Sequence, residues 1–72
     1  MTGLESVPVT LNGKKRYVAP GQTVTGLLES LDLNPALVVV EKNREILDRN
    51  LYPETPVEAG DSFELVHFVG GG

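Results

Sequence analysis

A single segment with helical periodicity limits the folds open to this chain of 72 residues. Four apolar residues fall at i, i+3, i+4 and i+7, which places them on one stripe of a helix: Val24, Leu27, Leu28 and Leu31. Thr23 is a candidate N-cap, Gly26 weakens the helix, and Asn34-Pro35 is expected to end it. Because one apolar stripe must be buried against another layer, the pattern predicts a helix across one face of a sheet.

Strand patterns lie on both sides of the helix. Residues 7–18, VPVTLNGKKRYV, indicate a β-hairpin in which Asn12-Gly13 supplies the two positive φ angles of a type I′ turn. The β-branched run at residues 36–43, ALVVVEKN, is typical of a strand that is central in a sheet or buried on both faces. A turn near Asn43-Arg44 then leads into a short strand.

The remaining segments complete the predicted topology. The short strand covers residues 45–47, and a connection with two prolines leads to a last strand at residues 62–68. This order predicts an α+β, ubiquitin-like β-grasp fold: a mixed four- to five-stranded sheet with one main helix packed across one face. A ferredoxin-like fold would need a second full helix, which the pattern lacks. We therefore predict a domain over residues 1–68 and a flexible Gly-rich C-terminal tail at residues 69–72.

Composition narrows the class of function. Ten acidic residues against six basic ones give a formal charge of −4, which disfavours nucleic acid as a partner. There is no cysteine and no apolar run as long as a membrane span, and residues 1–10 lack a basic and apolar leader. These features predict a cytoplasmic protein. We also expect the chain to be a monomer when alone. The basic run Lys14-Lys15-Arg16 is interpreted as a solvated hairpin shoulder, with docking of an acidic partner as the alternative.

The side chains offer little for catalysis within one chain. His67 is the only histidine, and alternation places it with Phe63 and Leu65, so we interpret it as partly buried at a sheet margin. No phosphate-binding glycine loop is present, and no metal site is predicted. Seven carboxylates lack paired spacing with the histidine and are interpreted as a solvated acidic surface: Glu41, Glu45, Asp48, Glu54, Glu58, Asp61 and Glu64.

The C-terminal sequence VHFVGGG is the unusual feature. If Phe63 faces inward, then Val66 and Phe68 face outward beside the glycines and form a candidate docking patch. The alternative is an ordinary strand followed by frayed glycines. Glycines lack Cβ atoms and fit a narrow slot, and three extended residues reach about 10 Å. The terminal carboxylate is ionised and a poor electrophile, so it would need activation by a partner.

These residues resemble a known family. The segment FELVHFVGGG after Gly60-Asp61 is similar to the C-terminus of the ThiS family, the sulfur carriers of thiamine biosynthesis. The segments LNGKKRYVAPGQTVTGLLESLDLNP and VVVEKNREILDR are similar to its opening hairpin and helix and to its central strand pair. Asp48, where the family often has proline, and Gly26 depart from the pattern; neither touches the tail.

The resemblance implies a function. Gly72 would be adenylated at its carboxylate by an ATP-dependent adenylyltransferase related to ubiquitin-activating enzymes, then converted to a thiocarboxylate by a persulfide donor. Thiazole synthase would receive the sulfur. ATP and Mg²⁺ would be used by the activating partner, and the chain itself would bind no cofactor. Gly71 and Gly70 would thread the slot, and the docking edge would contain Val66, Phe68 and Val69.

Three alternatives remain open at this stage. The small subunit of molybdopterin synthase is a related β-grasp sulfur carrier with a Gly-Gly end, although it is usually longer. A non-covalent ubiquitin-like interaction module and a protein modifier whose tail joins lysines are the others. In each case the protein is not an enzyme acting alone.

Overall fold

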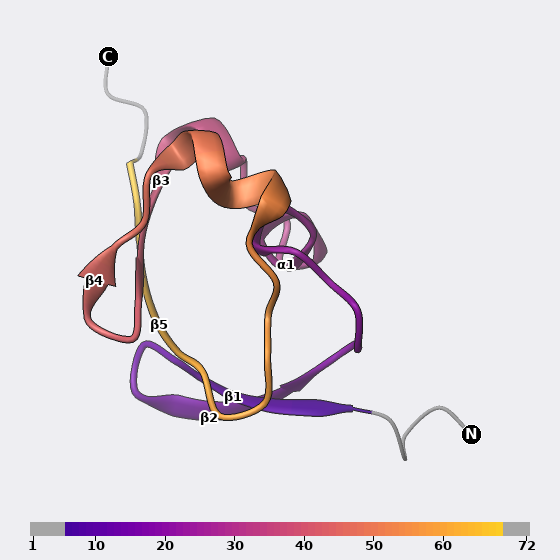
Figure 1. Cartoon of the computed structure of the whole chain (residues 1–72). Helices are drawn as coiled ribbons and strands as arrows, with labels where there is room; N and C mark the ends of the chain where they lie inside the picture. Colours follow the sequence, from indigo (N-terminus) through magenta and orange to yellow (C-terminus); the bar gives the residue numbers. More distant parts are fainter. Residues whose placement is uncertain (1–5, 69–72) are drawn as a thin grey trace.

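The computed structural model describes residues 6–68, which form a five-stranded mixed sheet with one α-helix across one face (Figure 1). The strand order in the sheet is β2-β1-β5-β3-β4. β1 and β5 are parallel, and the other neighbouring pairs are antiparallel. The predicted α+β architecture is confirmed. The strands are β1 Val7–Leu11, β2 Lys14–Val18, β3 Val38–Lys42, β4 Glu45–Ile46 and β5 Ser62–His67.

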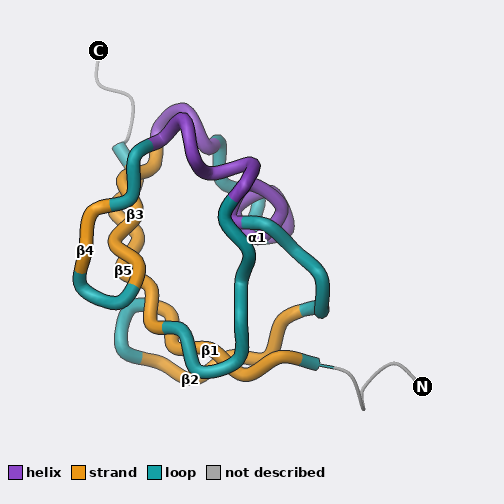
Figure 2. The backbone as a smooth tube through the Cα atoms, in the orientation of Figure 1, coloured by secondary structure: helices purple, strands orange, loops and turns teal. Residues whose placement is uncertain are grey.

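The helix α1, Val24–Ser30, begins as predicted, because the Thr23 hydroxyl oxygen accepts a hydrogen bond from the Gly26 amide at 3.2 Å. Its buried residues are Val24, Leu27 and Leu28, the first three of the predicted stripe. The start of α1 is also joined to the loop that leads to β5, since the Val24 amide donates to the Thr55 carbonyl at 2.9 Å. Figure 2 shows this returning loop running beside the helix.

The end of α1 differs from the prediction. Asp32 has φ 60°, and the amides of Asp32 and Leu33 donate to Glu29 and Leu28 at 3.0 and 2.9 Å. This is the hydrogen-bond pattern of a Schellman motif, with aspartate in the position that glycine usually takes. The expected stop at Asn34 is therefore wrong: Asn34 instead caps a separate short 3₁₀ helix, η2 Pro35–Leu37.

Both predicted turns have the required backbone. Asn12 and Gly13 have φ angles of 49° and 84°, and Asn43 and Arg44 have 53° and 73°. Two consecutive positive φ angles match the type I′ geometry, whose twist suits a tight hairpin. The type I′ geometry of the β1–β2 turn therefore follows from its Asn-Gly sequence, and the β3–β4 turn lies where the sequence predicted a turn.

The core lies between the sheet and α1, and one part of it was missed. Tyr52, in the 3₁₀ helix η3 Arg49–Glu54, is only 2% exposed, although its sequence context predicted a connection. Its hydroxyl donates to the Val38 carbonyl at 2.8 Å, which satisfies its buried polar group. The buried apolar residues are Val9, Leu11, Val24, Leu27, Leu28, Val38, Val40, Tyr52, Val57 and Phe63.

Strand β3 is interior to the sheet but is not buried on both faces. It lies between β5 and β4, with Val38 and Val40 fully buried toward the helix. Val39, which points to the other face, is only partly buried. Within the described residues the helices and 3₁₀ helices cover one face of the sheet (Figure 1), so the opposite face of β3 stays accessible.

Candidate docking face at the end of the last strand

Strand β5 carries two kinds of side chain on its two faces. Phe63 is fully buried against the helix side, whereas Val66 and Phe68 are 56% and 55% exposed. The predicted orientation of Val66 and Phe68 is confirmed. β1 pairs with β5 only at Ser62 and Phe63, so Val66 and Phe68 lie beyond that pairing, where β5 is joined to β3 alone.

The register adds residues that the sequence alone did not bring together. Val66 pairs with Val39 across β5 and β3, and directly paired residues point to the same side of the sheet. Ile46, which is 71% exposed, pairs with Glu41, which in turn pairs with Glu64. We call the exposed apolar surface formed by Val39, Ile46, Val66 and Phe68 the outer patch. An apolar group of this kind on an open sheet face is typical of a protein contact.

Two carboxylates border the outer patch. Glu41 and Glu64 are direct partners across β3 and β5, so their side chains are on the same face. Like charges directly opposite each other in a sheet are unfavourable. Within residues 6–68 the one ion pair is Lys42–Asp61, so neither Glu41 nor Glu64 forms an ion pair with a described base.

Backbone hydrogen bonds continue past the end of β5. The Phe68 amide donates to the Leu37 carbonyl at 2.8 Å and continues the pairing beyond the strand. On the adjacent strand, the Val38 carbonyl accepts both from Tyr52 Oη and from Arg49 Nη2, the latter at 3.2 Å. The backbone is therefore hydrogen-bonded to the neighbouring chain as far as Phe68. The predicted site residues Val69, Gly70, Gly71 and Gly72 lie outside the described residues.

A buried polar cluster supports the start of the same strand. Asp61 is 7% exposed and accepts hydrogen bonds from Asn43 Nδ2 at 3.1 Å and the Glu58 amide at 2.8 Å. Lys42 Nζ lies 3.6 Å from the same carboxylate. The interpretation of Asp61 as a solvated acid is therefore wrong. It ties the β3–β4 turn to β5, a role that only the folded arrangement reveals.

His67 was interpreted as partly buried at a sheet margin. It lies on the helix side of β5 as predicted, but it is exposed rather than partly buried. Its partner across β3, Val38, is fully buried, whereas β1 pairs with β5 only as far as Phe63 and does not flank His67. Within residues 6–68, no three His, Cys, Asp or Glu side chains are arranged to hold a metal. The same part of the chain contains no helix long and apolar enough to cross a membrane.

Comparison with solved structures defines the class. The fold is similar to a designed protein based on a human erythrocytic ubiquitin template, with a TM-score of 0.53 and 24% identity over 94% of this chain and 96% of that one. A mixed sheet that holds one helix in this way is a ubiquitin-like β-grasp domain, as predicted. The crystal structure of the thiamine biosynthesis protein ThiS from Geobacter metallireducens is more similar, with a TM-score of 0.76 and 38% identity over 92% of this chain and all of that one.

Sequence comparison defines the family. The ThiS family matches residues 9–72, and the chain belongs to this family. It is 41% identical to the sulfur carrier protein ThiS of Bacillus subtilis, over 86% of this chain and 96% of that protein. It is also 38% identical to a thiazole synthase of Magnetococcus marinus over 89% of this chain. The chain spans only 20% of the length of that synthase.

Proposed function

We propose that this chain is a sulfur carrier for the thiazole of thiamine, with the Gly72 carboxylate as its working group. The observation that carries the proposal is the family match, which extends through residue 72 and therefore includes the terminal glycines. Similar proteins of Bacillus subtilis and Escherichia coli bear the name sulfur carrier protein ThiS. The outer patch, which includes Phe68, would be the docking surface next to the tail.

The proposed chemistry begins with activation of Gly72. A carboxylate oxygen attacks the α-phosphate of ATP, pyrophosphate leaves, and an acyl adenylate forms. A persulfide sulfur then attacks the acyl carbon, AMP leaves with the bonding electrons, and an acyl disulfide results. A thiol reduces its S–S bond, which leaves the thiocarboxylate. The activating partner, an adenylyltransferase related to ubiquitin-activating enzymes, would hold ATP and Mg²⁺, and this use of ATP fits a cytoplasmic location.

The folded domain would dock on the partner and so position the tail. Ordering a glycine-rich tail costs on the order of 1–2 kcal/mol per residue, so docking elsewhere must offset that cost. Val66 and Phe68 are exposed next to the tail and can supply apolar burial. Glu41 and Glu64 lie side by side on the same face, so a partner with complementary charge would place a basic side chain over them.

Thiazole synthase is the proposed receiver of the sulfur. In the thiazole synthases of Magnetococcus marinus and Paramagnetospirillum magneticum, a segment similar to this chain occupies 20% of the protein. A segment similar to this chain and the rest of a thiazole synthase thus occur in one polypeptide, which supports the proposal that this chain acts together with a thiazole synthase. It also favours the thiazole pathway over molybdopterin synthesis.

Deletion of Gly72 tests the proposal. The shortened chain would place its carboxylate about 3.5 Å away from the activated phosphate, and about 1 Å of misplacement can already cost ~100-fold in rate. Wild type, incubated with ATP, Mg²⁺, the adenylyltransferase and a persulfide donor, should gain the mass of one sulfur minus one oxygen by mass spectrometry. The deletion variant should gain none, and one residue added after Gly72 should also block loading.

Thermal unfolding provides the control, since loss of one terminal residue is generally tolerated and should leave the Tm nearly unchanged. Equal loading of the deletion variant would show that Gly72 is not the working group. If wild type binds the partners but never gains sulfur, the protein is a non-covalent interaction module instead.

A further inference from the structure

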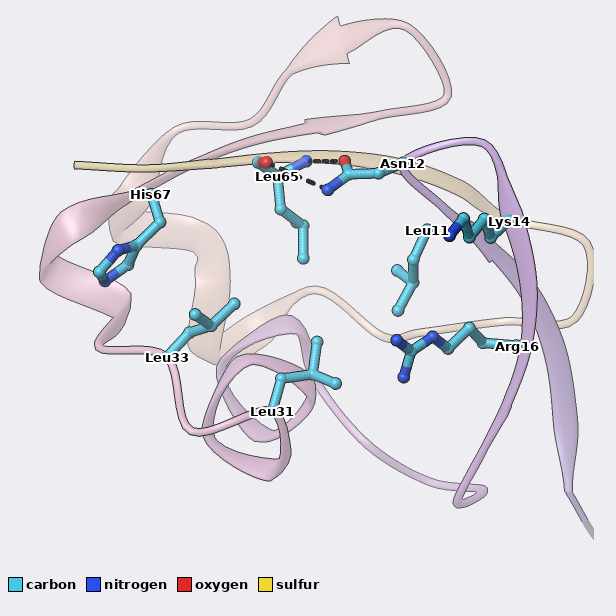
Figure 3. A pocket seen from close by; sticks show the side chains of 8 residues that line it. All are labelled: Leu11, Asn12, Lys14, Arg16, Leu31, Leu33, Leu65 and His67. Carbon is cyan, nitrogen blue, oxygen red and sulfur yellow. Dashed lines mark hydrogen bonds between the residues drawn. The ribbon is translucent and has the colours of Figure 1, made fainter. Parts of the chain in front are cut away.

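A hollow of about 450 Å³ lies on the helix side of the sheet, on the opposite face of β5 from the outer patch (Figure 3). It is open to solvent on one side. Its floor combines side chains from β1, the chain after α1, and β5. We call it the leucine hollow after its four apolar residues: Leu11, Leu31, Leu33 and Leu65.

The early end of the helix explains the hollow. α1 stops at Ser30, and the turn at Asp32 redirects the chain before it can cover this end of the sheet. Leu31, Leu33 and Leu65 pack against the core yet remain only partly buried. Within residues 6–68, no side chain closes the space above them.

The rim of the leucine hollow is basic. Arg16 and Lys14 pair with Val9 and Leu11 across the hairpin and therefore point to the helix side. In Figure 3, Lys14 and Arg16 lie at one end of the hollow and His67 at the other, with the leucines between them. Among the residues that the structure describes, no acidic one lines the space, although the chain as a whole carries a charge of −4.

The polar groups at the hollow do not converge as they do in a small-molecule site. Such sites place a few fixed polar groups to orient the ligand. The amide of Asn12 is already engaged, accepting from the Leu65 amide at 2.7 Å and donating to the Leu65 carbonyl at 3.4 Å. What remains is an apolar floor with charges on the rim, which is the anatomy of a protein interface.

We propose that the leucine hollow is a docking site for an acidic segment of a partner protein, one with apolar side chains between its carboxylates. The apolar side chains fill the space over Leu33 and Leu65, and the carboxylates meet the bases at the two ends. The inference concerns a different face from the outer patch and does not depend on the sulfur chemistry. Of the two interpretations of the basic run, it favours docking of an acidic partner over a solvated shoulder, and it assigns that role to Lys14 and Arg16.

A titration with a synthetic peptide tests the proposal. The probe is a short peptide with leucines at its centre and glutamates on both sides, added to the ¹⁵N-labelled full chain and followed by NMR. Amide shifts should centre on Leu33, Leu65 and His67, and higher salt should weaken the binding. The same peptide with glutamines for glutamates, or with serines for leucines, should bind at least about tenfold more weakly.

A matched pair of variants locates the site on the chain. Arg16→Glu should weaken binding by about tenfold or more through charge reversal, whereas Lys15→Glu should not. Lys15 is adjacent in β2 but pairs with Thr10 on the other face, so it matches the charge change without touching the hollow. Both positions are exposed, so both variants should fold.

Several results would overturn the proposal. The first is absence of binding, and the second is equal loss of affinity in both variants. Shifts centred on Val39 and Val66 would place the peptide on the outer patch instead. Equivalent shifts with hexanoate alone would identify a small-molecule site. If the same amides shift on dilution without peptide, or on removal of residues 69–72, the occupant is a second copy or the chain's own tail.

Discussion

Asn12 is expected to determine how firmly β1 is joined to β5, the strand that carries Val66. Its backbone has φ 49°, in the left-handed region, and its amide donates to the Phe63 carbonyl at 2.8 Å. Its side chain accepts from the Leu65 amide at 2.7 Å and returns a longer bond of 3.4 Å to the Leu65 carbonyl. One side chain thus extends the β1–β5 pairing beyond Leu11, the last paired residue of β1.

Two contributions are lost in Asn12→Ala. The left-handed backbone costs an ordinary L-residue about 1 kcal/mol more than it costs asparagine. Loss of the side-chain hydrogen bonds costs about 1 kcal/mol, a modest value because the bonds are exposed and water can replace them. The free energy of unfolding should therefore fall by about 2 kcal/mol, which lowers Tm by roughly 8–16 °C in a domain of this size.

Matched variants separate the two contributions. Asn12→Asp keeps the oxygen that accepts from Leu65 and tolerates the left-handed backbone, so it should stay within about 0.5 kcal/mol of wild type. Asn12→Gly keeps the backbone conformation but removes the side chain, so it should lose about 1 kcal/mol. Urea unfolding with linear extrapolation measures each value. If Asn12→Ala is as stable as wild type, or Asn12→Asp is as unstable as Asn12→Ala, the reasoning is refuted.

Three further predictions follow from single positions. Val66→Lys should weaken binding of the adenylyltransferase by about 1–3 kcal/mol without unfolding the domain, whereas Tyr17→Lys, an exposed site two strands away, should not; calorimetric titration would detect the difference. Gly26→Ala should raise the free energy of unfolding by about 0.5–1 kcal/mol, since the new Cβ would meet its nearest atoms at an ordinary 3.8 Å; an unchanged or lower Tm would contradict this. Tyr52→Phe should cost about 0.5–1.5 kcal/mol in urea unfolding, and no more, because Arg49 still donates to the Val38 carbonyl.

The candidate site was only partly predictable from the sequence. Alternation along β5 was sufficient to place Val66 and Phe68 outward, because the period of a strand is fixed by its backbone. Ile46 could not be assigned to the same surface, since it reaches that face through the registers of two strand pairs. The burial of Asp61 and the exposure of His67 were missed because each depends on which distant segment covers it.

What the sequence determined by itself is local. The turns at Asn12-Gly13 and Asn43-Arg44, the Thr23 cap and the apolar stripe of α1 depend on backbone preferences and spacing within a few residues. Only the tertiary structure decides three other features: the position of β5 between β1 and β3, the burial of Tyr52 with its hydrogen bond to Val38, and the leucine hollow. The physical reason is that these features join residues far apart in the chain, so their stability comes from packing that no local pattern contains.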